Sequence, residues 1–304
     1  MRLPERIFHQ NYPYISSASK SWIKHASAYA KKMCKELSLD HSTLVIELAS
    51  NDGYLLSEFK KLNVPVLGVE PASNVAAIAE NSGVPTIVEF FGAKEAELIL
   101  EKYGHPRLIV ANNVFAHIPD LQDFTKGISI LSDENTITTI ENPSFVRLLE
   151  NSLFDTIYHE HYSYHTAHSV KNVVQKFNLH LIRVEELSTH GGSNRYWISR
   201  KNNSDNSVIK TLRDETNGGL FDESKWNSFA QKSNHAISGL RQWLKERQDA
   251  GDRVVGYGAA HKGNTFLNSV GTEAKILRYV VDSSIEKQGK YLPGSQVPVL
   301  PPDE

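Results

Sequence analysis

Cysteine is almost missing from this sequence, since Cys34 is the only one among 304 residues. A single cysteine can form neither an internal disulfide nor a multi-cysteine zinc site. No apolar run approaches the roughly 20 residues of a membrane-spanning helix, and the start, MRLPERIFHQNYPY, lacks the apolar core of a secretory signal. The net charge of -2 gives no global field favouring nucleic acid or an anionic membrane. These absences favour a cytoplasmic protein without nucleic-acid or membrane partners. The oligomeric state that we expect is a monomer.

What the sequence does contain is ordinary globular composition, with 40% hydrophobic and 22% charged residues. Strand and helix signals alternate through its first half. We expect helices at 19–37, 54–62, 72–83, 93–104 and 120–131, and strands at 43–48, 64–70, 84–90, 107–113 and 135–141. This order predicts an α/β fold, with a parallel sheet covered by helices on both faces.

The second half of the sequence is less regular. We expect a helix at 165–177, strands at 179–187 and 193–200, an exposed loop at 200–207, a long helix at 222–250, a strand, glycine-rich turn and helix at 253–264, a strand at 276–282 and a final loop at VPVLPPDE. The glycine-rich turn predicts a second, partly Rossmann-like α/β domain. The domains are therefore predicted as an N-terminal helical segment (1–40), a cofactor-binding domain (41–150) and a C-terminal substrate-binding domain (151–304).

The stretch ELASNDGYLL lies where a doubly wound fold binds its ligand, at the carboxyl end of the first strand. Gly53 is present there, but Ala49 and Asn51 occupy positions where glycines often stand, so the motif alone also fits a plain tight turn. VLGVEP ends the second strand with Glu70, a carboxylate placed to accept hydrogen bonds from both ribose hydroxyls. Together these features indicate a nucleoside-binding half.

The choice of cofactor lies between a dinucleotide and S-adenosylmethionine. A pyrophosphate prefers a glycine-rich helix start, whereas Asp52 would repel it and would suit an ammonium or sulfonium group. The sequence therefore favours S-adenosylmethionine. The predicted cofactor-binding residues are Glu47, Ala49, Asn51, Gly53, Glu70, Pro71, Asn112, Asn113 and His117.

A series of motifs carries a family resemblance. ELASNDGYLL, VLGVEP, ANNVFAHIPD, ENPSF, FDTIYHEHYSY, THGGSNR, GYGAAHKGNTFLN and KQGKYLPGSQVPVLPP together resemble the sugar C-methyltransferases. These enzymes use S-adenosylmethionine to methylate C-3 of a nucleotide-linked 4-keto-6-deoxysugar, and the resemblance implies a Rossmann-like class I methyltransferase domain. Two departures are visible. The family usually begins with a cysteine-rich zinc module and continues beyond VPVLPP, so this chain is expected to be shortened at both ends.

The resemblance implies that the YHEH of DTIYHEHYSY (155–164) is catalytic. A carbon beside a ketone can be methylated only after it loses a proton, and histidine has a suitable pKa for the base. The enolate formed then needs hydrogen-bond donors at its oxygen. We assign His161 as the base, Tyr158 as the donor to the oxygen and Glu160 as an orienting acid.

The geometry of this cluster leaves alternatives open. In an extended segment Tyr158 would pair with Glu160, and His159 with His161; a turn or helical kink would bring Tyr158 to His161. We favour a helical turn. A metal site lacks a third ligand that the sequence can place, so we expect none. A purely structural cluster remains an alternative.

Further candidates come from the other motifs. NYPYISS resembles the family segment whose tyrosine reaches the active site, which makes Tyr12 and Tyr14 catalytic candidates. The predicted substrate-binding residues are Asn142, Ser144, His190, Arg195, His261, Lys262 and Asn264. Each also has a plain structural interpretation, as a turn residue, a helix cap or a packing residue.

We therefore expect a C-methyltransferase of a nucleotide-linked deoxysugar. Three alternatives remain: an O-methyltransferase on the same scaffold, a NAD-dependent oxidoreductase that uses GYGAAHKG, and an inactive shortened remnant.

Overall fold

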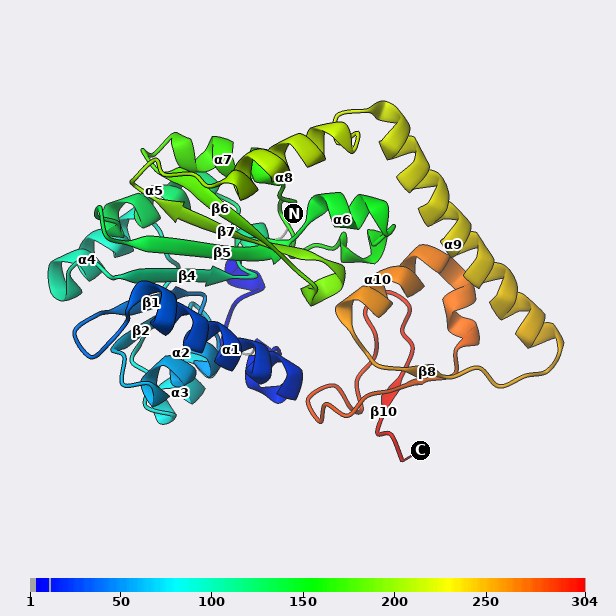
Figure 1. Cartoon of the computed structure of the whole chain (residues 1–304). Coiled ribbons are helices and arrows are strands. Elements are labelled where there is room, and N and C mark those ends of the chain that lie inside the picture. Colours follow the sequence, from blue (N-terminus) through cyan, green and yellow to red (C-terminus); the bar gives the residue numbers. More distant parts are fainter. Residues whose placement is uncertain (1–3, 11, 304) are drawn as a thin grey trace. The chain divides into compact units, whose positions relative to one another are not determined.

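The computed structural model describes residues 4–10 and 12–303 and divides into two compact units (Figure 1). Unit 1 takes its residues from 1–145 and 160–218, and unit 2 from 146–159 and 219–304. The predicted boundary at 150/151 therefore falls inside 146–159, a short segment that belongs to unit 2. Residues 160–218 pack with the cofactor-binding half. No helix among the described residues is both long and apolar enough to cross a membrane.

Unit 1 is built on a seven-stranded sheet of order β3-β2-β1-β4-β5-β7-β6. Its strands are β1 (Val45–Leu48), β2 (Val66–Val69), β3 (Thr86–Ile87), β4 (Leu108–Asn112), β5 (Ile137–Pro143), β6 (His180–Leu187) and β7 (Ser193–Ser199). The first five strands are parallel, which confirms the predicted Rossmann-like α/β fold.

The last two strands of this sheet correct the sequence prediction. The strands expected at 179–187 and 193–200 exist, but they extend the cofactor-binding sheet and do not form part of a separate C-terminal domain. β7 pairs antiparallel with β5, and β6 pairs antiparallel with β7. The physical reason is the short turn between β6 and β7, because a connection of this length can join only antiparallel neighbours.

Helices cover both faces of the unit 1 sheet (Figure 1). One face carries α1 (Lys20–Leu37), α2 (Tyr54–Lys61) and α3 (Ser73–Asn81). The other carries α4 (Ala93–Tyr103), α5 (Leu121–Leu131), α7 (Ala167–Gln175) and α8 (Asn206–Asn217). Strand side chains alternate between these faces: Val45 packs with the first set of helices, and Ile46 and Leu48 with the second.

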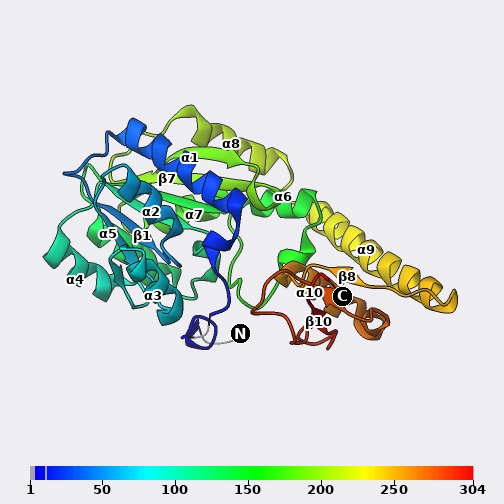
Figure 2. The same cartoon turned by 90° about the horizontal axis from the view of Figure 1, so that it is seen from below.

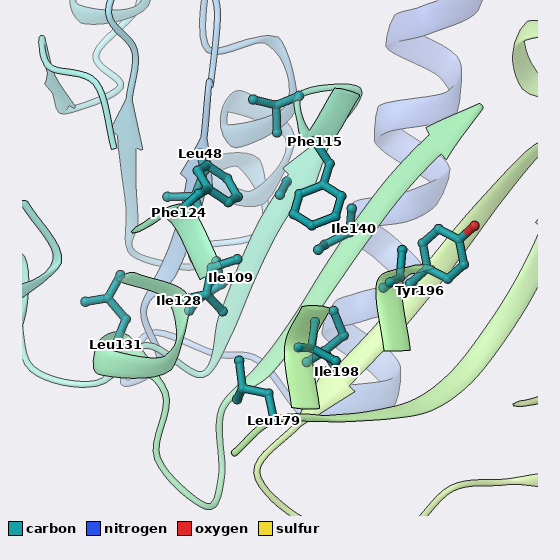
Figure 3. Close-up of a cluster of buried hydrophobic side chains, with 14 of the residues drawn as sticks. Leu48, Ile109, Phe115, Phe124, Ile128, Leu131, Ile140, Leu179, Tyr196 and Ile198 are labelled. Carbon is teal, nitrogen blue, oxygen red and sulfur yellow. The ribbon is translucent and has the colours of Figure 1, made fainter. Parts of the chain in front are cut away.

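The core under the second set of helices is large and apolar. Figure 3 shows Phe115, Phe124, Ile128 and Ile140 directed into it beside Tyr196 of β7. At roughly 1.5–3 kcal/mol for each large side chain removed from water, this burial stabilises the packing of these helices on the sheet.

Helix caps explain several boundaries of unit 1. The Ser19 side chain accepts the Trp22 backbone N–H, so α1 begins at Lys20, as the sequence predicts. The expected exposed loop at 200–207 is wrong at its end, because Asp205 accepts the Ser207 N–H and starts α8. The short helix α6 (Phe145–Glu150) was not predicted.

Unit 2 contains the helices α9 (Glu223–Asp249) and α10 (His261–Val270) and the strands β8 (Gly256–Tyr257), β9 (Val280–Val281) and β10 (Val299–Leu300). The three strands are parallel, in the order β10-β9-β8. Gly258, with φ of 89°, makes the turn between β8 and α10. The expected final loop is partly wrong, since Val299 and Leu300 pair with β9.

Candidate active site

The loop from β1 to α2 contains three residues with positive φ: Ala49 at 57°, Asn51 at 50° and Gly53 at 75°. A left-handed conformation costs a residue with a Cβ about 1–2 kcal/mol, so glycine is its usual occupant. At Gly53 a Cβ would also lie 3.0 Å from the Ala79 Cβ of α3. The chain therefore keeps the tight turn of a nucleoside-binding loop with only one of the usual glycines.

Glu70, directly after β2, is oriented by backbone donors. Its Oε2 accepts the Asn51 N–H at 2.9 Å and its Oε1 accepts the Ala72 N–H at 2.9 Å, with Pro71 between Glu70 and Ala72. Burial raises the pKa of Glu70 and these N–H groups lower it, leaving a net rise to which Asp52 adds. Because each carboxylate oxygen can accept more than one hydrogen bond, Glu70 keeps capacity for ribose hydroxyls.

Two more carboxyl groups follow from the same loop. Glu47 is 1% exposed and Asp52 is 4% exposed. Glu47 Oε2 and Asp52 Oδ1 have no hydrogen-bond partner among the described residues. Burial, together with the charges of Asp52 and Glu70, holds the pKa of Glu47 well above its usual range. In their ionised form such groups suit a cationic ligand and would repel a pyrophosphate.

Asn112 ends β4 and Asn113 follows it. Their Oδ1 atoms are buried and have no partner within the described part of the chain. The Asn113 N–H donates to the Glu141 carbonyl oxygen at 2.7 Å, which fixes the bend after the strand. Since β4 lies beside β1, these amides and the loop after β1 meet at the topological switch point of the sheet.

The predicted base is held at this same edge. The 3-10 helix η3 (Phe115–His117) follows β4, and His117 Nδ1 lies 2.9 Å from the carbonyl oxygen of the buried Glu160. The His117 and His161 rings are 4.8 Å apart, centroid to centroid, at an interplanar angle of 65°. His161 is thus adjacent to a predicted cofactor-binding residue.

Tyr158 belongs to unit 2, where its ring lies 5.7 Å from the ring of His261. The backbone bends and turns over residues 158–160 without forming a helix or a strand. The sequence predicts a helical turn here, and the structure shows a bend at Tyr158 followed by a turn at 159–160. The roles of Tyr158 and Glu160 remain predictions.

Tyr12 and Tyr14 lie in the segment that leads into α1 (Figure 2); Asn11 of the same motif is outside the described residues. The Tyr12 ring packs 5.2 Å from Phe8, which in turn lies 5.7 Å from the His117 ring. Tyr14 is 46% exposed, and its carbonyl oxygen accepts a 3.2 Å hydrogen bond from the Asn51 side chain. Both tyrosines are therefore connected to cofactor-loop residues.

Arg195, which was predicted to bind a substrate phosphate, forms ion pairs inside unit 1. It is 3% exposed, its Nη2 donates to Glu141 at 2.6 Å, and its Nη1 donates to Glu185 at 3.3 Å. Its guanidinium carbon also stacks 4.4 Å from the Tyr29 ring. The expected phosphate contact has no support, because two carboxylates already hold this guanidinium inside unit 1.

The other predicted substrate residues of unit 1 lie near the carboxyl end of β5. Asn142 is 2% exposed, and its Oδ1 has no partner among the described residues. Ser144 donates its backbone N–H to the Gly192 carbonyl oxygen at 3.0 Å. His190 has φ of 54° and lies 5.2 Å, ring to ring, from Trp22. Three predicted residues therefore share one end of the sheet.

The substrate residues predicted in unit 2 lie at the start of α10. His261 is its first residue, Lys262 follows, and the Asn264 Oδ1 is buried without a partner in the described chain. Asp282, which was not predicted, accepts the Ala259 N–H at 2.7 Å and so fixes the turn before α10. Among the described residues, no group of three His, Cys, Asp or Glu side chains is placed to hold a metal ion.

Three residues near the site were missed from the sequence: Asn74, Glu141 and His25. Asn74 bonds the segment before α1, and Glu141 accepts from His25 Nε2 at 3.1 Å. Although burial raises the pKa of Glu141, the His25 hydrogen bond and the Arg195 charge keep it below its usual range. Only Glu141 had a signal, as an acid at the end of a predicted strand.

Comparison with known proteins identifies the class that this fold and edge define. Residues 22–184 match the methyltransferase domain family, and residues 188–304 match the C-methyltransferase C-terminal domain. The chain is 32% identical over 297 residues to C-methyltransferase NovU of Streptomyces niveus, covering 97% of this chain and 71% of NovU. The chain belongs to the C-methyltransferase family and is an S-adenosylmethionine-dependent methyltransferase.

Solved structures show more distant similarity. Magnesium protoporphyrin IX methyltransferase (ChlM) of Synechocystis PCC 6803, with bound S-adenosylhomocysteine, is 12% identical, with a TM-score of 0.45 over 59% of this chain and 83% of that one. An S-adenosylmethionine-dependent methyltransferase of Clostridium acetobutylicum is 13% identical, with a TM-score of 0.46 over 58% of this chain and 91% of that one.

The residues present fit S-adenosylmethionine. Backbone N–H groups hold the Glu70 carboxylate in place with capacity left for ribose hydroxyls, and the unpartnered oxygens of Glu47 and Asp52 suit the ammonium group of the cofactor's methionyl part. The unpartnered amide oxygens of Asn112 and Asn113 offer further acceptors at the same edge. S-adenosylmethionine carries no phosphate, so its binding site needs no group that binds an anion of that kind.

Proposed function

We propose that this enzyme methylates a carbon beside a ketone, at C-3 of a nucleotide-linked 4-keto-6-deoxysugar, with His161 as the base. The observation that carries the proposal is the position of the His161 ring, 4.8 Å from His117 at the carboxyl edge of the sheet. This edge also carries Glu70 and Glu47, so a proton acceptor stands next to the cofactor-binding loops.

Backbone bonds make His161 suitable for this role. The Tyr162 N–H donates to the Ala116 carbonyl oxygen at 2.8 Å, and His117 Nδ1 bonds the Glu160 carbonyl oxygen, so both neighbours of His161 are tied to η3. A base must be held within hydrogen-bond reach of the proton it removes. Fixing the backbone on each side limits how far the imidazole can move.

The chemistry assigned to the chain is one proton transfer and its electrostatic support. A His161 ring nitrogen takes the C-3 proton, and the electron pair moves into an enolate whose charge lies on the C-4 oxygen. Tyr158 is proposed to donate a hydrogen bond to that oxygen; loss of such a donor costs roughly 2.7–4 kcal/mol of barrier. Bound S-adenosylmethionine supplies the electrophilic methyl group.

The sugar assignment comes from the sequence resemblance, and the C-methyltransferase family supports its chemistry. Carbon methylation requires a carbon acid, whereas oxygen methylation does not. Exchange of the C-3 proton with solvent, catalysed by the enzyme, therefore distinguishes the proposed reaction from O-methylation.

The test is His161→Ala, with the exposed His235→Ala of α9 as the matched control. We expect methyl transfer to fall by roughly 10²–10⁴-fold, the usual contribution of general acid–base catalysis, while S-adenosylhomocysteine still binds. Deuterium wash-in at C-3 without the methyl donor should occur with the parent and the control, and stop in His161→Ala. Parental methylation or wash-in by His161→Ala would rule out this base.

A further inference from the structure

We infer that Asn74 is a positioning residue, which holds the N-terminal strap (residues 12–17) against the cofactor-binding loops. In this position Tyr12 supports Phe8 and His117, the rings that lead to His161. The inference rests on the proposed function only for its effect on methyl transfer. Asn74 is the second residue of α3, the helix that follows the Glu70 loop. Figure 2 shows the dark-blue chain that runs from the N-terminal loop to α1, of which the strap is a part.

One side chain bonds both backbone groups of Tyr12. Asn74 Nδ2 donates to the Tyr12 carbonyl oxygen at 2.8 Å, and Asn74 Oδ1 accepts the Tyr12 N–H at 3.2 Å. The Tyr12 N–H is also 3.0 Å from the His9 carbonyl oxygen and is shared between two acceptors. The Asn74 amide thus pairs with the Tyr12 backbone through one donor and one acceptor, as the backbone of a neighbouring β-strand would. Of its two contacts, the one made by the Asn74 donor is the shorter.

The other end of the strap is held by the loop after β1. Asn51 Oδ1 accepts the Ser16 N–H at 2.9 Å, and Asp52 Oδ2 accepts the Ser17 N–H at 3.0 Å. The backbone N–H of the same Asn51 donates to Glu70 Oε2 at 2.9 Å. The strap and the carboxylate assigned to the ribose therefore share one residue, and the strap depends on side chains that belong to the cofactor loops.

Tyr12 connects the strap to the predicted base through a row of rings. Its ring lies 5.2 Å from Phe8, the Phe8 ring lies 5.7 Å from His117, and the His117 ring lies 4.8 Å from His161. Aromatic pairs at these distances each contribute packing energy. If the strap detaches from the cofactor-binding loops, the Phe8 ring loses its contact with Tyr12. The face of the His117 ring that packs on Phe8 is then less well supported.

A different role for Asn74 would be to stabilise the start of α3. Asn74→Asp separates the two roles. Aspartate is almost the same size and keeps an acceptor, but it cannot donate to the Tyr12 carbonyl oxygen. A carboxylate in the first turn favours a helix through the helix dipole. The substitution should therefore strengthen α3 while it weakens the strap, and the two roles predict opposite outcomes.

The first measurement is amide hydrogen exchange of Ser16 and Ser17 in the cofactor-free protein. We expect Asn74→Asp and Asn74→Ala to speed exchange by about fivefold, as for one net hydrogen bond, because the strap opens as a unit. Glu80→Gln, an exposed change on the same helix, should have no effect. Parental exchange rates in Asn74→Asp would overturn the inference.

The second measurement separates binding from turnover. By isothermal titration, S-adenosylhomocysteine should bind Asn74→Asp within about threefold of the parent affinity, because Glu70 and Glu47 are unchanged. Turnover of the keto-sugar per binding site should fall roughly tenfold, with an unchanged KM for S-adenosylmethionine, since small misplacements at an active site are costly. Parental turnover, or loss of cofactor binding, would overturn the positioning role. If the parent itself does not methylate the sugar, the proposed function fails, and the exchange rates still decide whether Asn74 holds the strap.

Discussion

At the residue scale, Glu47 has the most unusual surroundings among the candidate cofactor residues. Its carboxyl group is buried, and one oxygen lacks a partner among the described residues. Its pKa is raised well above the usual range, first by burial and then by Asp52 and Glu70. Between the usual and the raised pKa, the cofactor-free protein therefore holds a proton on Glu47.

Glu47→Gln should weaken S-adenosylhomocysteine binding by roughly tenfold or more, the effect of a lost charged hydrogen bond. In the parent, the ligand ammonium favours the ionised carboxylate, so binding releases a proton and affinity rises with pH through this range. Titration in two buffers of different ionisation enthalpy measures that release. Glu47→Gln should abolish it and the exposed Glu97→Gln should not; release that persists in Glu47→Gln would assign the proton to another group.

The same pKa shift affects stability without ligand. A raised folded-state pKa means that the contribution of Glu47 is fully present below the unfolded pKa and is lost as pH rises through the folded pKa. Glu47→Gln should therefore unfold at a higher temperature than the parent at neutral pH, with a smaller difference at acid pH.

At the scale of elements, local signals in the sequence located most of unit 1 correctly. Ser19 and the apolar spacing of 19–37 gave α1 its start and end. The motif after β1 and the acid after β2 predict the edge of the sheet at which the ligand binds. Local signals could not give the direction of β7 or the use of Arg195, because the partner of Arg195, Glu141, lies 54 positions away in the sequence and meets it only through strand register.

The Glu141–Arg195 pair joins β5 to β7 inside the protein. Arg195→Met should destabilise the protein by about 3–5 kcal/mol, because it leaves the buried Glu141 without its main charged partner. Glu141→Gln combined with Arg195→Met should restore part of that loss. Urea unfolding followed by circular dichroism measures both, with the exposed Lys201→Met as the control. A double variant as unstable as the single one would show that the uncompensated charge is not the cause.

At the scale of the whole molecule, the chain forms two compact units whose limits differ from those of the matched families. The family matches divide near residue 186, whereas the chain passes into unit 2 for the short segment 146–159 and again, for the last time, at 218/219. The predicted cofactor-binding residues, from Glu47 to His117, all lie in unit 1. Cofactor binding should therefore be a property of that unit.

S-adenosylhomocysteine at 100 times its Kd should stabilise unit 1 by about 2.7 kcal/mol. Hydrogen exchange should slow in β1, β2 and β4 and remain unchanged in β8, β9 and β10. NAD at the same concentration should have no effect on either unit. Protection that appears first in the strands of unit 2 would contradict this assignment.

The antiparallel pairing of β7 with β5 determines where related enzymes can differ in sequence without a change in their core. Ser193 pairs with Pro143, so the hairpin bend at 188–192 emerges at the carboxyl end of β5. New residues inserted in that bend would reach the ligand side directly, while the ladder that joins β5, β7 and β6 stayed intact. Acceptor preference could thus change by exchange of one surface connection, with no repacking of the interior.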